Sequence, residues 1–122
     1  GDGSPIRDFI YSGDVADGML EVVRQGYNKP INLGSGNGVS IKEIATSIAN
    51  KMPDKCEIVW DTSKPAGDHK RIMNTKRAES IGISPKISLD EGIESTIKWY
   101  TEYKDKDLQR YNAFTDKLYT NK

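Results

Sequence analysis

The sequence predicts a small mixed α/β domain that has short strands, about four helices and a sheet that needs further strands to be complete. Two capping-box signatures, each followed by apolar residues at helical spacing, predict two of the helices. Short runs of branched and aromatic residues between the helices predict strands, in the order β-α-β-α-β-α-α. Parallel strands of about 4–5 residues need cover on both faces and both edges, so three of them do not close a sheet.

The first third of the chain is predicted to form a strand, a helix and a second strand. Residues 7–11 are an aromatic and branched run that is typical of a strand. Asp14 is the expected N-cap of the helix, because its carboxylate can accept from the free amides of the first turn, and the helix ends near Gly26. Its apolar face comprises Val15, Met19, Val22 and Val23. Residues 30–33 form the second predicted strand, which ends at the glycine-rich residues 34–38.

Two capping boxes open the next long helix and the last one. Ser40 and Glu43 start a helix whose apolar residues recur at helical spacing as far as Pro53. Ser88 and Glu91 start a helix that we expect to run past residue 103. The apolar stripe of this last helix, which we expect to pack inward, comprises Leu89, Ile93, Ile97 and Tyr100.

The segment between these two helices is predicted to contain a strand, a loop and a short helix. Residues 57–60 have the composition of a third strand, and the polar loop 61–71 follows it. A short helix is expected from about Thr75 to Gly82. The tail from Lys104 is polar, and we expect it either to extend the last helix or to fray.

Composition and charge limit the classes of function. The chain has 122 residues, of which 18 are basic and 18 acidic, and its formal net charge is zero. This balance argues against a general binder of nucleic acid or membrane surfaces, which needs a basic excess, but it is compatible with a small cationic pocket. No apolar run approaches the roughly 20 residues of a membrane span, and one cysteine, Cys56, excludes an internal disulfide. We therefore expect a soluble, cytoplasmic protein.

Three stretches in a fixed order carry a resemblance to a known family. They are Gly-Asp-Gly-Ser-Pro-Ile-Arg-Asp-Phe-Ile-Tyr with Asp-Val-Ala-Asp in residues 1–17, Ile-Asn-Leu-Gly-Ser-Gly with Val-Ser-Ile-Lys-Glu in residues 31–43, and residues 57–93 from Glu-Ile-Val-Trp to Leu-Asp-Glu-Gly-Ile. Together they resemble the C-terminal third of the extended short-chain dehydrogenase/reductase family, which contains NAD(P)-dependent nucleotide-sugar epimerases and dehydratases. Each stretch alone is weak, and the ordered set is specific.

The resemblance implies a division of labour. In that family the N-terminal two-thirds forms the Rossmann core, with the glycine-rich phosphate loop and the catalytic Tyr-x-x-x-Lys pair. We therefore expect residues 1–103 to be a C-terminal substrate-binding domain that lacks the Rossmann core, and residues 104–122 to be a helical extension or frayed tail. Residues 1–5 have turn chemistry with nothing before them, so we expect the chain to begin inside a loop of a longer protein, or at a leftover expression tag.

The resemblance singles out Arg7, Arg71 and Lys70 as substrate-binding residues. The matching arginine on the family's strand approaches the nucleotide diphosphate, and the family's loop contributes a second basic residue at the position of Arg71. Lys70 keeps a basic residue that often stands three places after Gly67. A planar guanidinium suits this task because it can grip phosphate oxygens with two parallel hydrogen bonds. Taken without the resemblance, a surface strand arginine and a solvated charge cluster are the competing interpretations.

Three further patterns suggest a cofactor or catalytic role, and we reject each. The glycines of residues 34–38 do not have the G-x-G-x-x-G spacing, so we interpret them as a turn into the Ser40 cap. Tyr100 and Lys104 match Tyr-x-x-x-Lys, but Tyr100 continues an apolar stripe and no cofactor loop precedes it. His69, the sole histidine, could serve as an acid or base, but the resemblance places the catalytic groups outside this chain. We therefore expect no catalytic residue, bound cofactor or metal here.

Two functions from different classes follow. In the first, the chain binds a nucleotide-diphosphate sugar as part of an NAD- or NADP-dependent epimerase, reductase or dehydratase, and is inactive alone. In the second, it is a free-standing, non-enzymatic binding or assembly module from a truncated gene. We also expect a homo-dimer that forms through an exposed sheet edge or a swapped segment. Departures such as Asn74, where the family usually has Asp, leave the nucleotide and sugar open.

Overall fold

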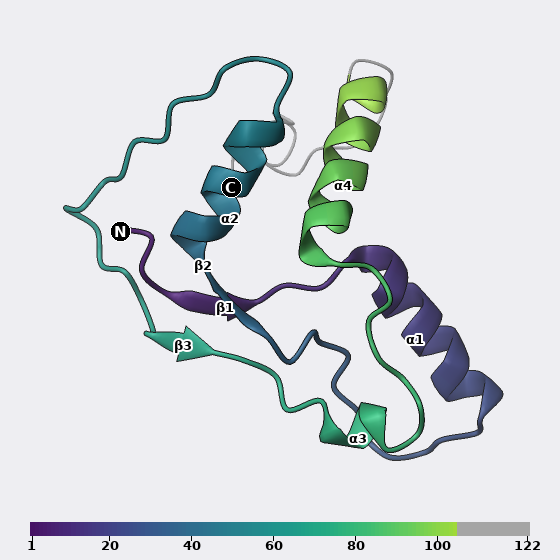
Figure 1. The fold of residues 1–122 in the computed structure, drawn as a ribbon. Helices are drawn as coiled ribbons and strands as arrows, with labels where there is room; N and C mark the ends of the chain where they lie inside the picture. The colour runs from purple at the N-terminus through teal and green to yellow at the C-terminus, as the bar shows by residue number, and fades with distance from the viewer. Residues whose placement is uncertain (105–122) are drawn as a thin grey trace, which may run out of the picture.

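The computed structural model describes residues 1–104 and has four helices and three short strands in that range (Figure 1). The elements are β1 (Ile6–Asp8), α1 (Ser12–Arg24), β2 (Gly38–Ser40), α2 (Ile41–Lys51), β3 (Lys70–Arg71), α3 (Lys76–Glu79) and α4 (Leu89–Tyr103). This arrangement confirms the predicted mixed α/β class with short strands and four helices. The predicted tail lies outside the described residues, apart from Lys104, which caps α4.

The sheet has the order β2-β1-β3, with β1 in the centre. β2 pairs with β1 in antiparallel orientation and β3 pairs with it in parallel orientation. In the described residues these three strands do not form the extended parallel sheet of a dinucleotide-binding domain.

Two of the three predicted strands are wrong in position. Residues 30–33 and 57–60 form no strand, and the first strand is shorter than the predicted residues 7–11. The reason is that a strand requires a neighbour for its amides and carbonyls, and β1 has only two edges. These edges pair with residues 38–40, which had been predicted as part of a turn, and with residues 70–71, which had been predicted as loop.

Both capping boxes are confirmed. The Ser40 hydroxyl accepts from the Glu43 amide at 3.1 Å, and the Glu43 carboxylate accepts from the Ser40 amide at 2.8 Å. Ser88 and Glu91 repeat this exchange at the start of α4, at 3.3 and 3.0 Å. Hydrogen bonds from the serine side chain and backbone lower the pKa of both glutamates, so each carboxylate also complements the positive end of its helix.

Asp14 has a different role from the predicted N-cap. Tyr11 is the N-cap of α1, and Asp14 lies in the first turn with only 8% of its surface exposed. Its carboxylate accepts from the Ile87 amide at 3.0 Å, so it ties α1 to the segment before α4. On the predicted apolar face of α1, Met19 and Val23 are 60% and 78% exposed, so this part of the face is not covered by the described residues.

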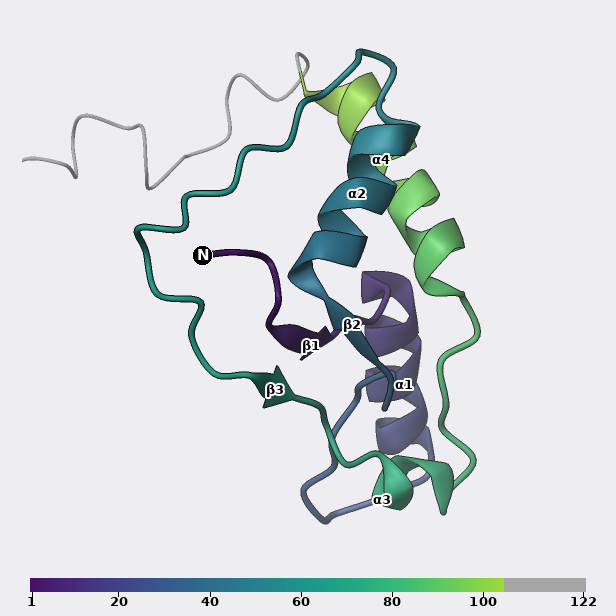
Figure 2. The same ribbon diagram turned by 60° about the vertical axis from the view of Figure 1, so that its left-hand side comes forward.

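Few residues form the core. The buried apolar side chains of the described residues are Ala78, Ile83 and Ile93. α2 and α4 lie side by side (Figures 1 and 2), and Lys51 Nζ contacts Asp90 Oδ2 at 2.9 Å across them. The long segment between α2 and β3 runs along the outside of the molecule in both views.

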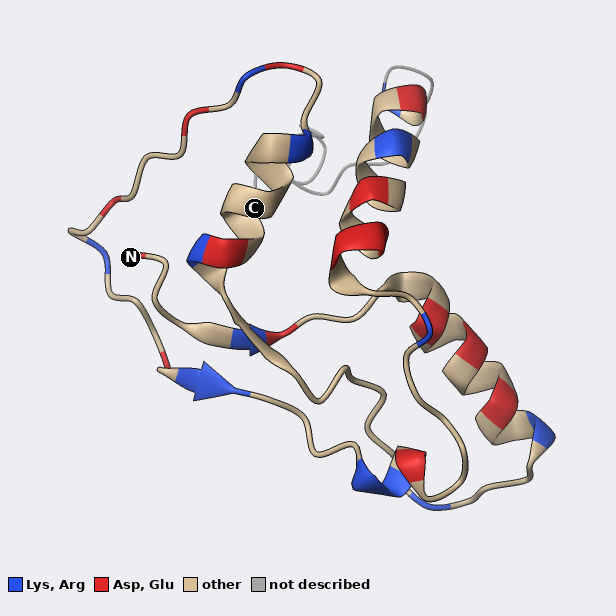
Figure 3. Cartoon of the chain, in the orientation of Figure 1, with Lys and Arg blue, Asp and Glu red and all other residues tan. Residues whose placement is uncertain are grey.

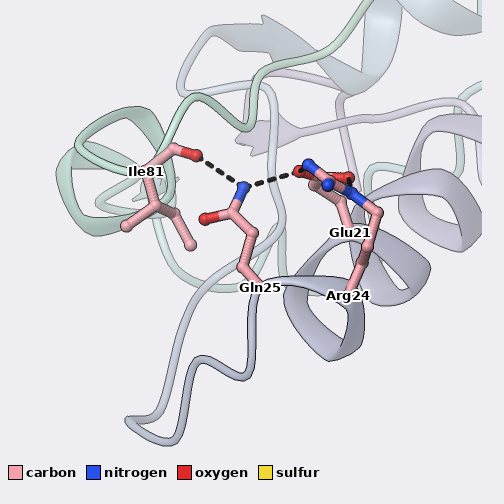
Figure 4. A network of polar contacts seen from close by, with 4 residues as sticks. All are labelled: Glu21, Arg24, Gln25 and Ile81. Atoms are coloured by element: carbon pink, nitrogen blue, oxygen red, sulfur yellow. Dashed lines mark hydrogen bonds and ion pairs between the residues drawn. The ribbon is translucent and has the colours of Figure 1, made fainter.

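A polar network fixes the C-terminal end of α1 (Figure 4). Glu21 accepts from Arg24 and from Gln25, whose amide nitrogen also donates to the Ile81 carbonyl at 3.0 Å. The hydrogen bond from Arg24, followed by that from Gln25, lowers the pKa of Glu21 to about 2. Gln25 thereby links α1 to the turn that follows α3.

Candidate functional site

The sheet brings Arg7 and Arg71 together. Arg7 on β1 and Arg71 on β3 are direct partners in the parallel register. Side chains alternate between the two faces of a strand, so partners in register project from the same face. Figure 3 shows the basic positions of β1 and β3 next to each other. Two arginines that are 64 positions apart in the sequence therefore share one patch of surface.

Arg7 is half-buried and anchored by the main chain. Its Nη1 donates to the carbonyl oxygens of Ile6 and Asp68, each at 2.8 Å. Close beside it, Gly67 has a φ of +82°, and a Cβ built there would lie 3.7 Å from Arg7 Nη2. The loop before β3 therefore passes directly over the Arg7 guanidinium.

Arg71 is exposed, and its ion pair is with the same loop. Its Nη2 lies 2.6 Å from Asp68 Oδ2, and the two side chains are 74% and 60% exposed. Lys70 behaves differently, because its register partner is Ile6. Strand alternation puts Lys70 on the face of Ile6, opposite to the arginine pair. The structure thus brings together two of the three predicted residues and places Lys70 on the other face.

Asp8 is the residue that the sequence analysis missed. Its Oδ1 accepts from the Ser35 amide at 2.8 Å and from the Ser35 hydroxyl at 2.6 Å. Its Oδ2 accepts from the amides of Gly36 and Met73, each at 3.1 Å. One carboxylate thus joins β1, the glycine-rich loop and the segment after β3. The available signal was an acidic residue inside a strand, which needs several donors to be stable there.

These hydrogen-bond donors favour the ionised form of the Asp8 carboxyl group. Burial alone would raise the pKa of the carboxyl. The hydrogen bonds from Ser35, Met73 and Gly36 outweigh burial, and the pKa of Asp8 is lowered. Asp8 is therefore an ionised structural hub next to Arg7.

The glycines of residues 34–38 serve packing. A Cβ on Gly34 would lie 2.9 Å from Asp8 Oδ2, and one on Gly38 would lie 2.5 Å from Ile6 Cγ2. Only glycine lets the loop approach β1 this closely. The loop leads through β2 into the Ser40 cap of α2. Gly34 and Gly36 therefore lie in the predicted turn, whereas Gly38 is the first residue of β2.

His69 and Tyr100, the two candidates rejected for a catalytic role, both occupy structural positions. The His69 carbonyl accepts from the Ile6 amide at 2.9 Å, which extends the pairing of β1 with β3. Tyr100 is 53% exposed, so the expectation that it packs inward is wrong. Tyr100 instead lines an open apolar groove of about 600 Å³ between α2 and α4, together with Ile44, Ile48 and Trp99.

The described part of the chain contains neither a candidate metal site nor a candidate membrane-spanning helix. Residues 1–104 contain no group of three or more His, Cys, Asp or Glu side chains that could hold a metal ion. Within the same residues, no helix has the length and apolar character to cross a membrane.

No family model matches the chain. GDP-L-fucose synthase of Sinorhizobium fredii is 38% identical over 99 residues, which are 80% of this chain and 32% of that protein. The chain thus spans about a third of the length of the curated relatives that it matches.

Solved structures agree with the sequence relatives. An epimerase from Methanothermobacter thermautotrophicus matches with a TM-score of 0.75 and 27% identity, over 86% of this chain and 32% of that one. A GDP-mannoheptose C4 reductase from Campylobacter jejuni, solved with NADP bound, matches with a TM-score of 0.68 and 31% identity, over 83% and 33% of the two chains.

Proposed function

We propose that this chain, which belongs to the extended short-chain dehydrogenase/reductase family of nucleotide-sugar epimerases and reductases, binds the diphosphate of a nucleotide sugar with Arg7 and Arg71. The observation that carries the proposal is the in-register pairing of these two arginines on one face of the sheet. GDP-linked sugars are the favoured class, because the matched relatives include GDP-L-fucose synthases and a GDP-mannoheptose reductase.

The chemistry of the arginine pair suits a diphosphate. Neighbouring strands lie about 4.8 Å apart, so two guanidinium groups on adjacent strands can reach neighbouring phosphates of one ligand. A guanidinium stays charged at all relevant pH values and forms paired hydrogen bonds with phosphate oxygens. Lys70, on the opposite face, would contribute through its charge alone.

In this proposal residues 1–103 are the substrate-binding domain of a longer enzyme. The chain covers about a third of the length of its relatives, and its glycine-rich loop packs against β1. The cofactor, NAD or NADP, and the catalytic groups would then belong to the rest of the enzyme. The 122-residue chain alone should have neither epimerase nor reductase activity.

The test is a titration of the 122-residue chain with GDP, followed by amide NMR shifts. Each charge-assisted hydrogen bond contributes about 1.5–3 kcal/mol. Two such contacts correspond to a dissociation constant of about 1 mM, which is −4.1 kcal/mol. We expect Arg71→Ala and Arg7→Ala each to weaken binding by about tenfold or more.

Arg24→Ala is the matched control, because Arg24 is also an ion-paired surface arginine but lies on α1. It should leave the affinity for GDP unchanged. If GDP binds equally well to the wild-type chain and to both arginine variants of the sheet, the proposed site is wrong.

A further inference from the structure

Asp68 contacts both arginines of the candidate site through two different oxygens. Its main-chain carbonyl accepts from Arg7 Nη1 at 2.8 Å. Its carboxylate Oδ2 lies 2.6 Å from Arg71 Nη2. One residue thus presents two acceptors to the two guanidinium groups, as a phosphate ligand would.

The side-chain contact is one that a ligand can displace. Both members of the Arg71–Asp68 pair are mostly exposed, at 74% and 60%. An exposed ion pair of this kind typically shifts an equilibrium by no more than about fivefold and weakens further in salt. The whole stretch from residue 61 to residue 71 is exposed, so little packing holds the carboxylate in place.

The carboxylate also changes the charge of the site. Arg7 and Arg71 carry two positive charges, and Asp68 reduces their sum to one. A phosphate that approaches Arg71 meets the repulsion of this carboxylate and must replace it on the guanidinium. The carboxylate and a phosphate therefore compete for the same nitrogen atoms.

We propose that the Asp68 carboxylate is an internal competitor for anions, which occupies Arg71 and thereby sets the affinity of the arginine pair for a nucleoside diphosphate. This inference rests on the proposed function, because it assigns the regulation of the same site. An anion that carries a single charge and binds weakly does not displace the Asp68 carboxylate from Arg71. A ligand with two adjacent phosphates displaces it, because the second phosphate also binds Arg7.

The experiment compares Asp68→Asn with Asp17→Asn in the 122-residue chain. The asparagine variant keeps the size of the side chain and the main-chain carbonyl that accepts from Arg7. Asp17 is a matched control, because it is an exposed aspartate on α1 whose Oδ2 lies 3.5 Å from Lys86 Nζ. Its replacement by asparagine changes the net charge by the same amount. GDP and inorganic pyrophosphate are the ligands, and guanosine is the uncharged control ligand.

We expect Asp68→Asn to bind GDP and pyrophosphate about twofold to fivefold more tightly than the wild-type chain, as the removal of an exposed ion pair allows. Asp17→Asn should change either affinity by less than about twofold, because Asp17 lies on α1 and pairs with Lys86, and it contacts neither arginine of the site. In an Arg71→Ala background the gain from Asp68→Asn should disappear, because the competing nitrogen atoms are gone.

Each failure has its own signature. If GDP binds, Arg71→Ala loses it and Asp68→Asn binds no more tightly, the competitor role is wrong while the proposed function stands. If Asp68→Asn binds more weakly, the carboxylate positions Arg71 and does not compete with phosphate. If wild-type and variant chains all fail to bind GDP and pyrophosphate, the proposed function and this inference are both overturned.

Discussion

Replacement of Asp8 by asparagine should destabilise the protein strongly. The carboxylate accepts four hydrogen bonds from Ser35, Gly36 and Met73, at 2.6 to 3.1 Å. An asparagine amide keeps one oxygen and turns its NH₂ group toward the other donors, so the amides of two residues lose their acceptor. Each hydrogen bond to a charged group contributes about 1.5–3 kcal/mol. Two of them are lost, but water can partly satisfy the exposed amides of Gly36 and Met73, so we expect a loss of about 2 kcal/mol.

The assay is urea and thermal unfolding followed by far-ultraviolet circular dichroism. For a domain of this size, a loss of about 2 kcal/mol lowers Tm by about 8–16 °C. Ser35→Ala provides a graded comparison, because it removes one hydroxyl donor and leaves the three amide contacts in place. Its expected cost is about 1 kcal/mol. If Asp8→Asn unfolds at the same urea concentration as the wild-type protein, the carboxylate does not hold the loop and our account of the hub is wrong.

Further predictions concern packing, pH, assembly and the cofactor. Gly38→Ala should cost about 1–3 kcal/mol, because the added Cβ would lie 2.5 Å from Ile6 Cγ2, and exposed Thr46→Ala should not destabilise the fold in the same urea titration. The pKa of Asp8 is lowered in the folded state, so its contribution to stability is present above the ordinary value of 3.8 and is lost as pH falls through the folded pKa. Thermal unfolding from neutral pH down to about pH 2 should show this loss, and Asp8→Asn should flatten the curve; equal slopes would contradict the assignment. Residues 30–33 form no strand, so an edge strand there cannot mediate the predicted homo-dimer. Leu20 on α1 is 70% exposed, and burial of its apolar surface in a dimer would contribute about 25 cal/mol per Å². Sedimentation equilibrium should therefore show a dimer that Leu20→Lys weakens, and a 13.6 kDa monomer at every concentration would refute it. Calorimetry should detect no NADPH binding to the chain alone, and micromolar binding would refute the proposed division of labour.

The sequence by itself determined the starts of α2 and α4 and the end of α1. Ser40 with Glu43 and Ser88 with Glu91 are local pairs, three residues apart, and each fixes a helix start without help from the rest of the fold. The end of α1 before Gly26, which has a φ of +63°, is equally local. The family resemblance was also readable in the sequence, because it depends on the order of short motifs.

Only the tertiary structure decided the strands and the geometry of the candidate site. The branched and aromatic runs at residues 30–33 and 57–60 have strand composition, but β1 pairs instead with residues 38–40 and 70–71. Strand formation depends on a partner that is distant in sequence, and composition does not specify that partner. The same long-range pairing places Arg7 beside Arg71 and turns Lys70 to the opposite face, because side chains alternate along each strand. The structural contacts of Asp8 and Asp14 are likewise long-range, because both carboxylates accept from backbone amides that lie 27 to 73 positions away in the sequence.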